Sequence, residues 1–367
     1  MIEPRRSRPG AGAKSVIALL AAAVLGASAG DARSACALRR AAQSLPEGVA
    51  LWTDEANRVA LYVAQVRRDD DGAANAYHPC GGNFADAVCA DGVFGLDHIC
   101  SGAQVRDAAN QPVPPSEPVP GADRRSSARC LRTYREARDA GFPVCGAGKA
   151  CVGGWPGIVL AARTPQVPGL AERIPALRPA GDPFAGYFIS QTKLSRPDPK
   201  APDGRSAYVD SRTAPYIVVP GASVLTGADF GFGSSSRADL ALVIERQPQG
   251  PARAVFAVIA DTGPRGQIGE GSLALLGRLQ GHAPSELDAD RPQAAPLPSR
   301  AFPSLATYIL FANSGRFLQG LWPERDLAAA DIAAAGQKAL ESVGGVAALA
   351  GCPGVPADPG ALIFVKD

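Results

Sequence analysis

Residues 254–280, AVFAVIADTGPRGQIGEGSLALLGRLQ, form the most informative stretch of this chain. An apolar run ends in Asp261, and a loop rich in Gly and Pro then leads to Glu270, just before a helix-like pattern that begins at Ser272. The apolar run predicts a buried strand, because it has the length of a strand and is bounded by turn residues. Two carboxylates therefore stand at the two ends of one loop, between a buried strand and a buried helix.

Other segments of the chain also favour strands over helices. The 41 Gly and 33 Pro among 367 residues are typical of short strands and long loops rather than of a helical bundle. Helices are expected after Ser272 and at 129–142 and 323–345. We predict a mainly β fold with some helix (α+β), with a β-barrel-like core and disulfide-rich loops. Strands are expected at 157–163, 186–194, 215–221, 238–246, 252–261 and 306–313, with two more joined by a turn within 49–67.

The first 29 residues have the pattern of a secretory signal peptide. Basic residues precede an apolar stretch at 16–25, and small residues at 27–29 offer a cleavage site. An uncleaved membrane anchor is the alternative, although the apolar stretch is short for a span. We therefore expect a secreted or periplasmic protein with no stable membrane association after cleavage. The remainder, 36–367, is predicted to be a single domain with an irregular Cys/Pro-rich insertion at about 80–151.

The charge of the chain gives no sign of a polyanionic partner. Its 37 basic and 35 acidic residues are scattered and leave a formal net charge of +2. A nucleic-acid-binding protein usually carries a basic patch or a strong basic excess, so we expect no nucleic-acid partner. We also expect a monomer.

The eight cysteines predict disulfides, because their number is even and the compartment is oxidising. The neighbouring pairs Cys80–Cys89 and Cys145–Cys151 are plausible, but connectivity does not follow from sequence. A metal site is the alternative, since His78 and His98 lie beside cysteines. Their spacing fits no standard zinc pattern, so no metal and no cofactor is expected.

Asp261 and Glu270 are candidate catalytic residues. The loop between them contains several turn residues and must fold back, which would bring the two carboxyl groups toward one cleft. Hydrolysis of a sugar acetal needs such a pair, one carboxyl protonated and the other ionised. The structural alternative is that Asp261 caps the turn and Glu270 stabilises the N-terminus of the following helix.

The same stretch resembles the catalytic region of glycoside hydrolase family 75, the secreted chitosanases. The resemblance is carried by Ala260-Asp261-Thr262 and Ile268-Gly269-Glu270-Gly271-Ser272, and it extends to DGAANAYHP at 71–79, GLDHI at 95–99, 207–221 and 306–314. It covers roughly 48–345. It implies a catalytic domain that cleaves β-1,4 linkages inside chitosan or a related amino-sugar polymer with inversion. It also implies Asp261 and Glu270 as the catalytic acids, and we expect Glu270 as general acid and Asp261 as base or water-orienting group, or the reverse.

Further residues are predicted to bind the substrate. A cleft for the polycation chitosan should carry extra carboxylates, and loop residues that share the resemblance are candidates for sugar contacts. The predicted set is Asp210, Asp239, Tyr77, His78 and Asp97. One departure from the family lies at Ala238-Asp239-Leu240-Ala241, where Gly-Asp-Leu-Ala is expected.

Two other functions and one architecture remain open at this stage. The chain could be a non-catalytic exported module that binds cell-wall polysaccharide or a protein, or a related glycosidase acting on peptidoglycan or another glycan. By analogy, a strand followed by Asp261-Thr262-Gly263-Pro264, a loop and a helix also occurs in double-psi barrels, which makes that barrel type the architectural hypothesis.

Overall fold

The computed structural model describes only part of the chain, and the predicted signal peptide, His78 and Asp97 lie outside that part. In the described part, no helix is both long enough and apolar enough to cross a membrane. The described residues are 36–56, 58–74, 76–77, 79, 104–113, 128–143, 145–146, 148–153, 157–162, 173–198, 206–221, 225, 238–245, 250–282 and 301–365.

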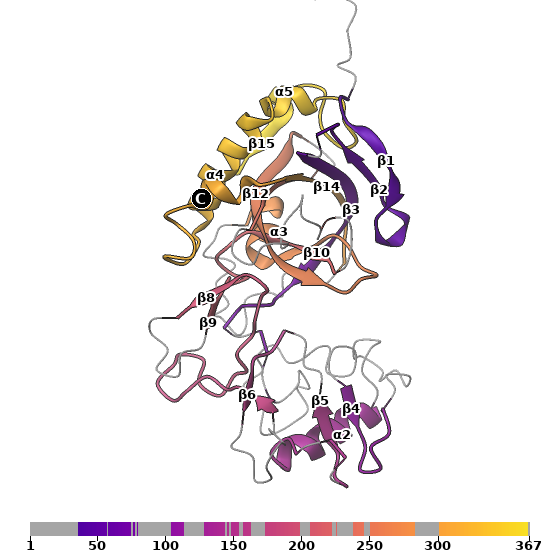
Figure 1. Cartoon of the computed structure of the whole chain (residues 1–367), viewed down its shortest axis with the longest axis vertical. Helices are drawn as coiled ribbons and strands as arrows, with labels where there is room; N and C mark the ends of the chain where they lie inside the picture. Colours follow the sequence, from indigo (N-terminus) through magenta and orange to yellow (C-terminus); the bar gives the residue numbers. More distant parts are fainter. Residues whose placement is uncertain are drawn as a thin grey trace, which may run out of the picture. The chain divides into compact units, whose positions relative to one another are not determined.

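A closed barrel of six strands forms the centre of the fold (Figure 1). In order of pairing the strands are β3 (Val59–Asp69), β13 (Glu270–Ser272), β10 (Tyr216–Pro220), β12 (Ala252–Gly263), β11 (Leu240–Glu245) and β14 (Ala301–Phe311), and β14 pairs with β3 to close the barrel. The β3–β13 and β10–β12 pairs are parallel, and the other four are antiparallel. This confirms the predicted β-rich α+β class with a barrel core.

Shorter elements surround or extend the barrel. Strands β1 (Arg39–Ser44) and β2 (Ala50–Thr53) continue the sheet beyond β3, and β15 (Leu362–Phe364) pairs with β12. The helices are α2 (Ala128–Asp139), α3 (Leu273–Gln280), α4 (Ala329–Ser342) and α5 (Gly345–Leu349), with 3-10 turns η1 (Pro46–Gly48), η5 (Ser314–Leu318) and η6 (Pro359–Ala361). Three small two-stranded sheets pair β4 (Gln104–Arg106) with β5 (Cys151–Gly153), β6 (Leu160–Ala162) with β7 (Arg173–Pro175), and β8 (Ser195–Pro197) with β9 (Ser206–Tyr208).

Both faces of the barrel sheet are buried. One face packs against α4, where Gly336 leaves room for the ring of Phe256; a Cβ at Gly336 would lie 2.4 Å from that ring. On the other face, the stacked rings of Tyr62 and Tyr308, with centroids 4.9 Å apart, join a cluster that includes Leu275 of α3. Burial on both faces explains why the barrel strands appear as nearly continuous apolar runs in the sequence.

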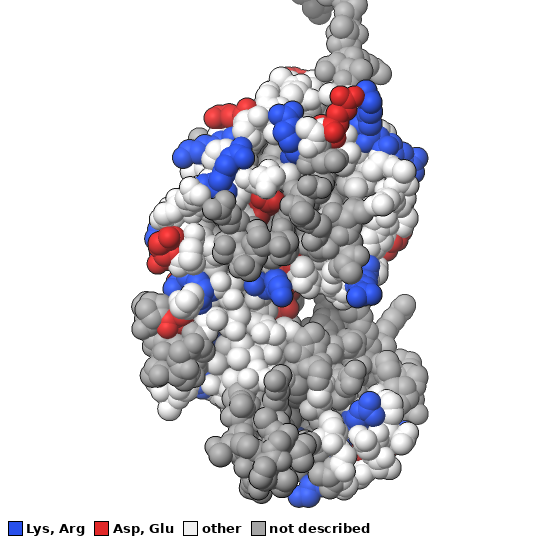
Figure 2. Space-filling model, viewed as in Figure 1, with Lys and Arg blue, Asp and Glu red and all other residues white. Residues whose placement is uncertain are grey.

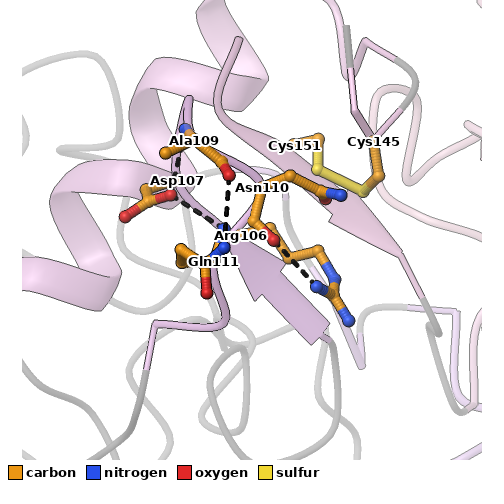
Figure 3. Close-up of a disulfide and its surroundings, with 7 residues drawn as sticks. All are labelled: Arg106, Asp107, Ala109, Asn110, Gln111, Cys145 and Cys151. Atoms are coloured by element: carbon orange, nitrogen blue, oxygen red, sulfur yellow. Dashed lines mark hydrogen bonds between the residues drawn. A yellow bond between two sulfur atoms is a disulfide. The ribbon is translucent and has the colours of Figure 1, made fainter. Parts of the chain in front are cut away.

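Disulfides are present, as the cysteine count predicts. The predicted Cys145–Cys151 bond exists beside β5, and Cys36–Cys352 joins residues 316 positions apart. Cys130 is also disulfide-bonded, whereas the suggested Cys80–Cys89 pair lies outside the described residues. Figure 3 shows the Cys145–Cys151 bond next to the turn after β4, where the Asp107 carboxylate accepts the backbone N–H groups of Ala109 and Gln111.

Two predicted elements differ from the structure. Residues 186–194 form only isolated bridges, because Gly186 has a φ of +85° and the preceding residues form hydrogen-bonded turns. The C-terminal helix begins at Ala329 rather than near Pro323. There the Asp331 carboxylate accepts the Ala328 N–H at 3.3 Å and caps the first turn.

Candidate active site

Asp261 and Glu270 lie on strands that flank β10. Strand β12 pairs with one side of β10, with Asp261 opposite Val218, and β13 pairs with its other side, with Gly271 opposite Ile217. The connection between β12 and β13 must therefore cross the end of β10. The loop folds back, and the Gly221 N–H donates to the Gly263 carbonyl at 3.0 Å where it crosses.

Gly269 allows the crossing loop to pack closely against β3 of the barrel. It has a φ of +92°, which is costly for other residues, and a Cβ there would lie 2.1 Å from the Gln65 carbonyl oxygen. The Gly269 carbonyl accepts the Tyr308 hydroxyl at 2.8 Å and the Arg67 N–H at 2.8 Å. These contacts fix the residue immediately before Glu270.

Two further acids, Asp69 and Asp71, join Asp261. Asp69 ends β3 and lies opposite Ser272 of β13, so the pairing of β3, β13, β10 and β12 brings it near Asp261. Carboxylate oxygens of Asp69, Asp71 and Asp261 lie within 4.8 Å of one another, and all three residues remain partly exposed. We call these three residues the aspartate cluster.

Glu270 contributes negative charge to the aspartate cluster. A Cβ at Gly263 would lie 2.6 Å from its Oε2, so the Glu270 side chain reaches back toward the end of β12. Its charge acts on both Asp69 and Asp261. The site therefore gathers four acids at one end of the barrel.

The Asp261 carboxyl is held by two backbone donors. The N–H groups of Lys193 and Thr262 donate to its Oδ1, at 3.0 and 2.7 Å. Lys193 lies 68 positions away in sequence, whereas Thr262 follows Asp261 on β12. The two bonds together fix the orientation of the carboxyl.

The Asp71 carboxyl is held by hydroxyl groups. Tyr77 donates to Oδ1, and the Ser190 hydroxyl, 3.3 Å from the same oxygen, also lies 3.1 Å from the Gly157 carbonyl. A Cβ at Gly157 would lie 2.5 Å from Asp71 Oδ1, so only glycine fits beside this carboxyl. The Asp71 N–H in turn donates to Asp69 Oδ1 at 3.0 Å.

Burial and mutual repulsion raise the pKa values of the aspartate cluster. Burial, followed by the charge of Asp69, raises the pKa of Asp261 to about 7, against the lowering effect of its backbone donors. Burial, followed by the charge of Asp261, likewise raises the pKa of Asp71 to about 7, against the hydrogen bonds from Tyr77 and Ser190. Burial and Asp71 raise the pKa of Asp69. The cluster therefore retains protons at a pH where ordinary carboxyls have lost them.

The other predicted site residues have diverse surroundings. Tyr77 contacts the aspartate cluster through Asp71. Asp210 forms an ion pair with Arg212 at 2.9 Å, and Asp239 is 4% exposed and accepts the Gly315 N–H at 3.1 Å. These partners give Asp210 and Asp239 structural roles, and their sugar contacts stay predictions, as do those of His78 and Asp97 outside the described residues.

Sequence reasoning assigned no catalytic role to Asp69 or Asp71, although a signal was present. Residues 67–82 are interpreted from sequence as a loop, whereas β3 continues through Asp69. Asp70 pairs with Arg68 at 2.6 Å, while the acids on either side of it join the cluster. The signal is the i, i+2 spacing of Asp69 and Asp71, which puts two side chains on one side of an extended backbone, although β3 itself ends at Asp69.

The aspartate cluster has oxygen ligands of the kind that divalent cations prefer. Acidic groups often gather without an ion, and this grouping alone does not assign one.

No family model matches the sequence, and none of the curated proteins matches it.

Proposed function

We propose that this protein is a glycosidase that hydrolyses β-1,4 linkages within chitosan or a related amino-sugar polymer with inversion of the anomeric carbon. One observation carries the proposal. Asp261 and Glu270 flank a single short strand within a partly exposed group of acids, and one of them has a pKa near 7. The resemblance of 260–262 and 268–272 to the family 75 chitosanases supports the same two residues.

The chemistry assigns one task to each acid. A protonated carboxyl donates its proton to the glycosidic oxygen as the bond from that oxygen to the anomeric carbon breaks. An ionised carboxylate takes a proton from the water that attacks the same carbon from the opposite face. The raised pKa of Asp261 favours it as the proton donor, with Glu270 activating water. This assignment is the reverse of the one first expected from the sequence.

A positively charged substrate suits the local electrostatics of the site. On the face shown in Figure 2, Lys and Arg side chains of the described residues are interspersed with Asp and Glu side chains rather than separated by sign. Attraction of a polyamine sugar chain would therefore come from the concentrated acids of the site and not from the whole surface.

The architecture proposed with this function is a double-psi type of barrel. Two parallel strand pairs within a closed six-stranded barrel support it, and so does the connection that leaves one side of β10 and returns on its other side.

Chitosan hydrolysis by the purified protein tests the proposal. We expect the wild type to release reducing ends, and Glu270→Gln and Asp261→Asn to lose nearly all of this activity. Asp182→Asn, which removes a charge from a turn outside the site, is the matched control and should keep the wild-type rate. Proton NMR early in the reaction should show the α-anomer as first product.

Three outcomes would contradict the proposal. Release of no reducing ends by the wild type would exclude catalysis on this polymer. Binding to chitosan without cleavage would favour the non-catalytic module, and first release of the β-anomer would exclude inversion.

A further inference from the structure

One short segment, residues 190–194, contacts two of the three acids in the aspartate cluster. At its start, the Ser190 hydroxyl lies 3.3 Å from Asp71 Oδ1. Toward its end, the Lys193 N–H donates to Asp261 Oδ1 at 3.0 Å. We call residues 190–194 the bridging segment, because it joins two acids that come from distant parts of the sequence.

The last two residues of the bridging segment bind consecutive residues of β12. Lys193 holds the Asp261 side chain, and the Leu194 N–H donates to the Ala260 carbonyl at 2.8 Å. A backbone donor can keep a carboxyl in one direction only if the donor itself is fixed in place. The conformation of the backbone at Lys193 therefore helps to set the direction of the Asp261 carboxyl, together with the Thr262 N–H.

Thr192 fixes the backbone at Lys193 through its side chain. Its hydroxyl donates to the Leu194 carbonyl at 2.9 Å, so this bond spans Lys193, and the same oxygen accepts the Val209 N–H at 3.1 Å. The Thr192 methyl group lies beside Gly72, where a Cβ would be 3.1 Å from it. Thr192 is 4% exposed, so its hydroxyl has these partners in place of water.

We propose that Thr192 is a positioning residue, whose hydroxyl holds the Lys193 N–H on the Asp261 carboxyl and so keeps this carboxyl aligned for catalysis. The role concerns the direction and hydrogen bonding of one carboxyl, and it does not depend on which acid of the cluster holds a proton. Thr192 acts through Lys193 and Asp261, and its catalytic consequence rests on the proposed function.

The bond from Lys193 also acts on the ionisation of Asp261. A backbone N–H favours the ionised form of a carboxyl, so this donor lowers the pKa of Asp261 against the effects of burial and neighbouring acids. Weakening of the bond should therefore raise that pKa. Lys193 itself is exposed. The other titratable groups around the carboxyl, in the part of the chain that the structure describes, include Asp69, Asp71, Glu270 and Tyr216.

Chitosan hydrolysis by two variants of Thr192 tests the positioning role. Thr192→Val keeps the methyl group but removes the hydroxyl, and kcat per folded molecule should fall about tenfold with KM nearly unchanged, because a misdirected carboxyl impairs the reaction more than substrate binding. Thr192→Ser keeps the hydroxyl and should retain most of kcat, although its melting temperature falls with the lost methyl group. Thr133→Val, which removes a buried hydroxyl bonded to the Arg129 carbonyl, is the matched control and should keep the wild-type kcat.

A second measurement needs no catalysis. In NMR spectra of the isotope-labelled free protein, the Lys193 amide should shift as the Asp261 carboxyl titrates at about pH 7, and Asp261→Asn should lose this response. In Thr192→Val the response should shrink and its midpoint should rise by about half a unit, whereas Thr192→Ser should respond as the wild type does. These changes in a protein that leaves chitosan intact would support the positioning role while contradicting the proposed function.

Three results would overturn the role of Thr192. The first is a Lys193 amide that shifts in the same way in the wild type and in Asp261→Asn, a comparison that needs no variant of Thr192 to fold. The second is a Thr192→Val protein with a lower melting temperature but wild-type kcat and amide response, since the hydroxyl would then have a purely structural role. The third is a kcat as low in Thr192→Ser as in Thr192→Val, because the methyl group would then matter rather than the hydroxyl.

Discussion

Asp261 lies on β12 and Asp239 lies next to the neighbouring strand β11, and the two aspartates have different surroundings. Asp239 precedes β11, is nearly fully buried, and accepts backbone N–H groups of the turn at 313–315, which oppose the effect of burial on its pKa. Asp261 is partly exposed and lies among other acids. Burial raises the pKa of both residues, but only Asp261 has like charges beside it that raise it further. The neighbours of an aspartate, rather than its burial, separate a structural cap from a candidate reactive group.

The largest effect that would test this comparison is the loss of activity in Asp261→Asn. We expect the rate of chitosan hydrolysis to fall about 10³-fold, because asparagine cannot supply the proton. Initial rates per folded molecule, with the folded fraction taken from circular dichroism, measure this. Full activity of Asp261→Asn would remove the functional half of the comparison.

Gly269→Ala sharpens the comparison by disturbing the loop between the two candidate catalytic acids. The new Cβ would overlap the Gln65 carbonyl, and alanine disfavours a φ of +92°, so a loss of about 3 kcal/mol in the free energy of unfolding is expected. Gly266→Ala in the same loop is the control, because a Cβ there meets nothing within 4 Å. Urea unfolding measures both variants, and equal stabilities would show that the tight crossing is not required.

Asp239→Ala tests the structural half. It leaves the buried Gly315 N–H without its acceptor, which should cost about 2 kcal/mol of unfolding free energy. The kcat and KM of the folded fraction should stay at wild-type values. A raised KM with unchanged stability would instead support the sugar contact predicted for Asp239 from the sequence.

The smallest expected effect is the pH dependence of stability. The pKa values of Asp71 and Asp261 are raised in the folded state, so the folded protein binds more protons than the unfolded chain between about pH 4 and pH 7. The contribution of these two carboxyls to stability should therefore be fully present below this range and be lost as the pH rises through about 7, by on the order of 1 kcal/mol after solvent screening. Thermal melts at about pH 5 and pH 8 measure the difference, which should shrink in Asp261→Asn. A wild-type melting temperature that rises with pH would contradict the assigned shifts.

Much of the barrel could be predicted from local sequence. The runs that became β10, β11, β12 and β14 are apolar on both faces and bounded by Gly, Pro or Asp, and Ser272 caps α3 through its hydroxyl, which accepts the Leu275 N–H at 3.1 Å. Residues 186–194 begin with a similar apolar run, Tyr187-Phe188-Ile189, but form only isolated bridges. Local pattern therefore predicts which segments can be extended, but not which of them find a partner.

The candidate site was only half predictable for a related reason. Asp261 and Glu270 are connected by one loop, so their proximity follows from a short stretch of chain. Asp71 is about 190 positions from Asp261, and the Ser190 and Gly157 that surround it come from other segments. No spacing rule links these positions.

The sequence by itself determined the β-rich class, the strand–loop–helix unit around Asp261 and Glu270, and the presence of disulfides, because each depends on residues close together or on composition. The tertiary structure alone decided that β3 lies beside β13, so that Asp69 and Asp71 share one end of the barrel with Asp261. It thereby also decided their protonation, because the pKa of a carboxyl depends on its burial and on charges a few ångströms away. Neither the burial nor the neighbouring charges can be read from the order of residues along the chain.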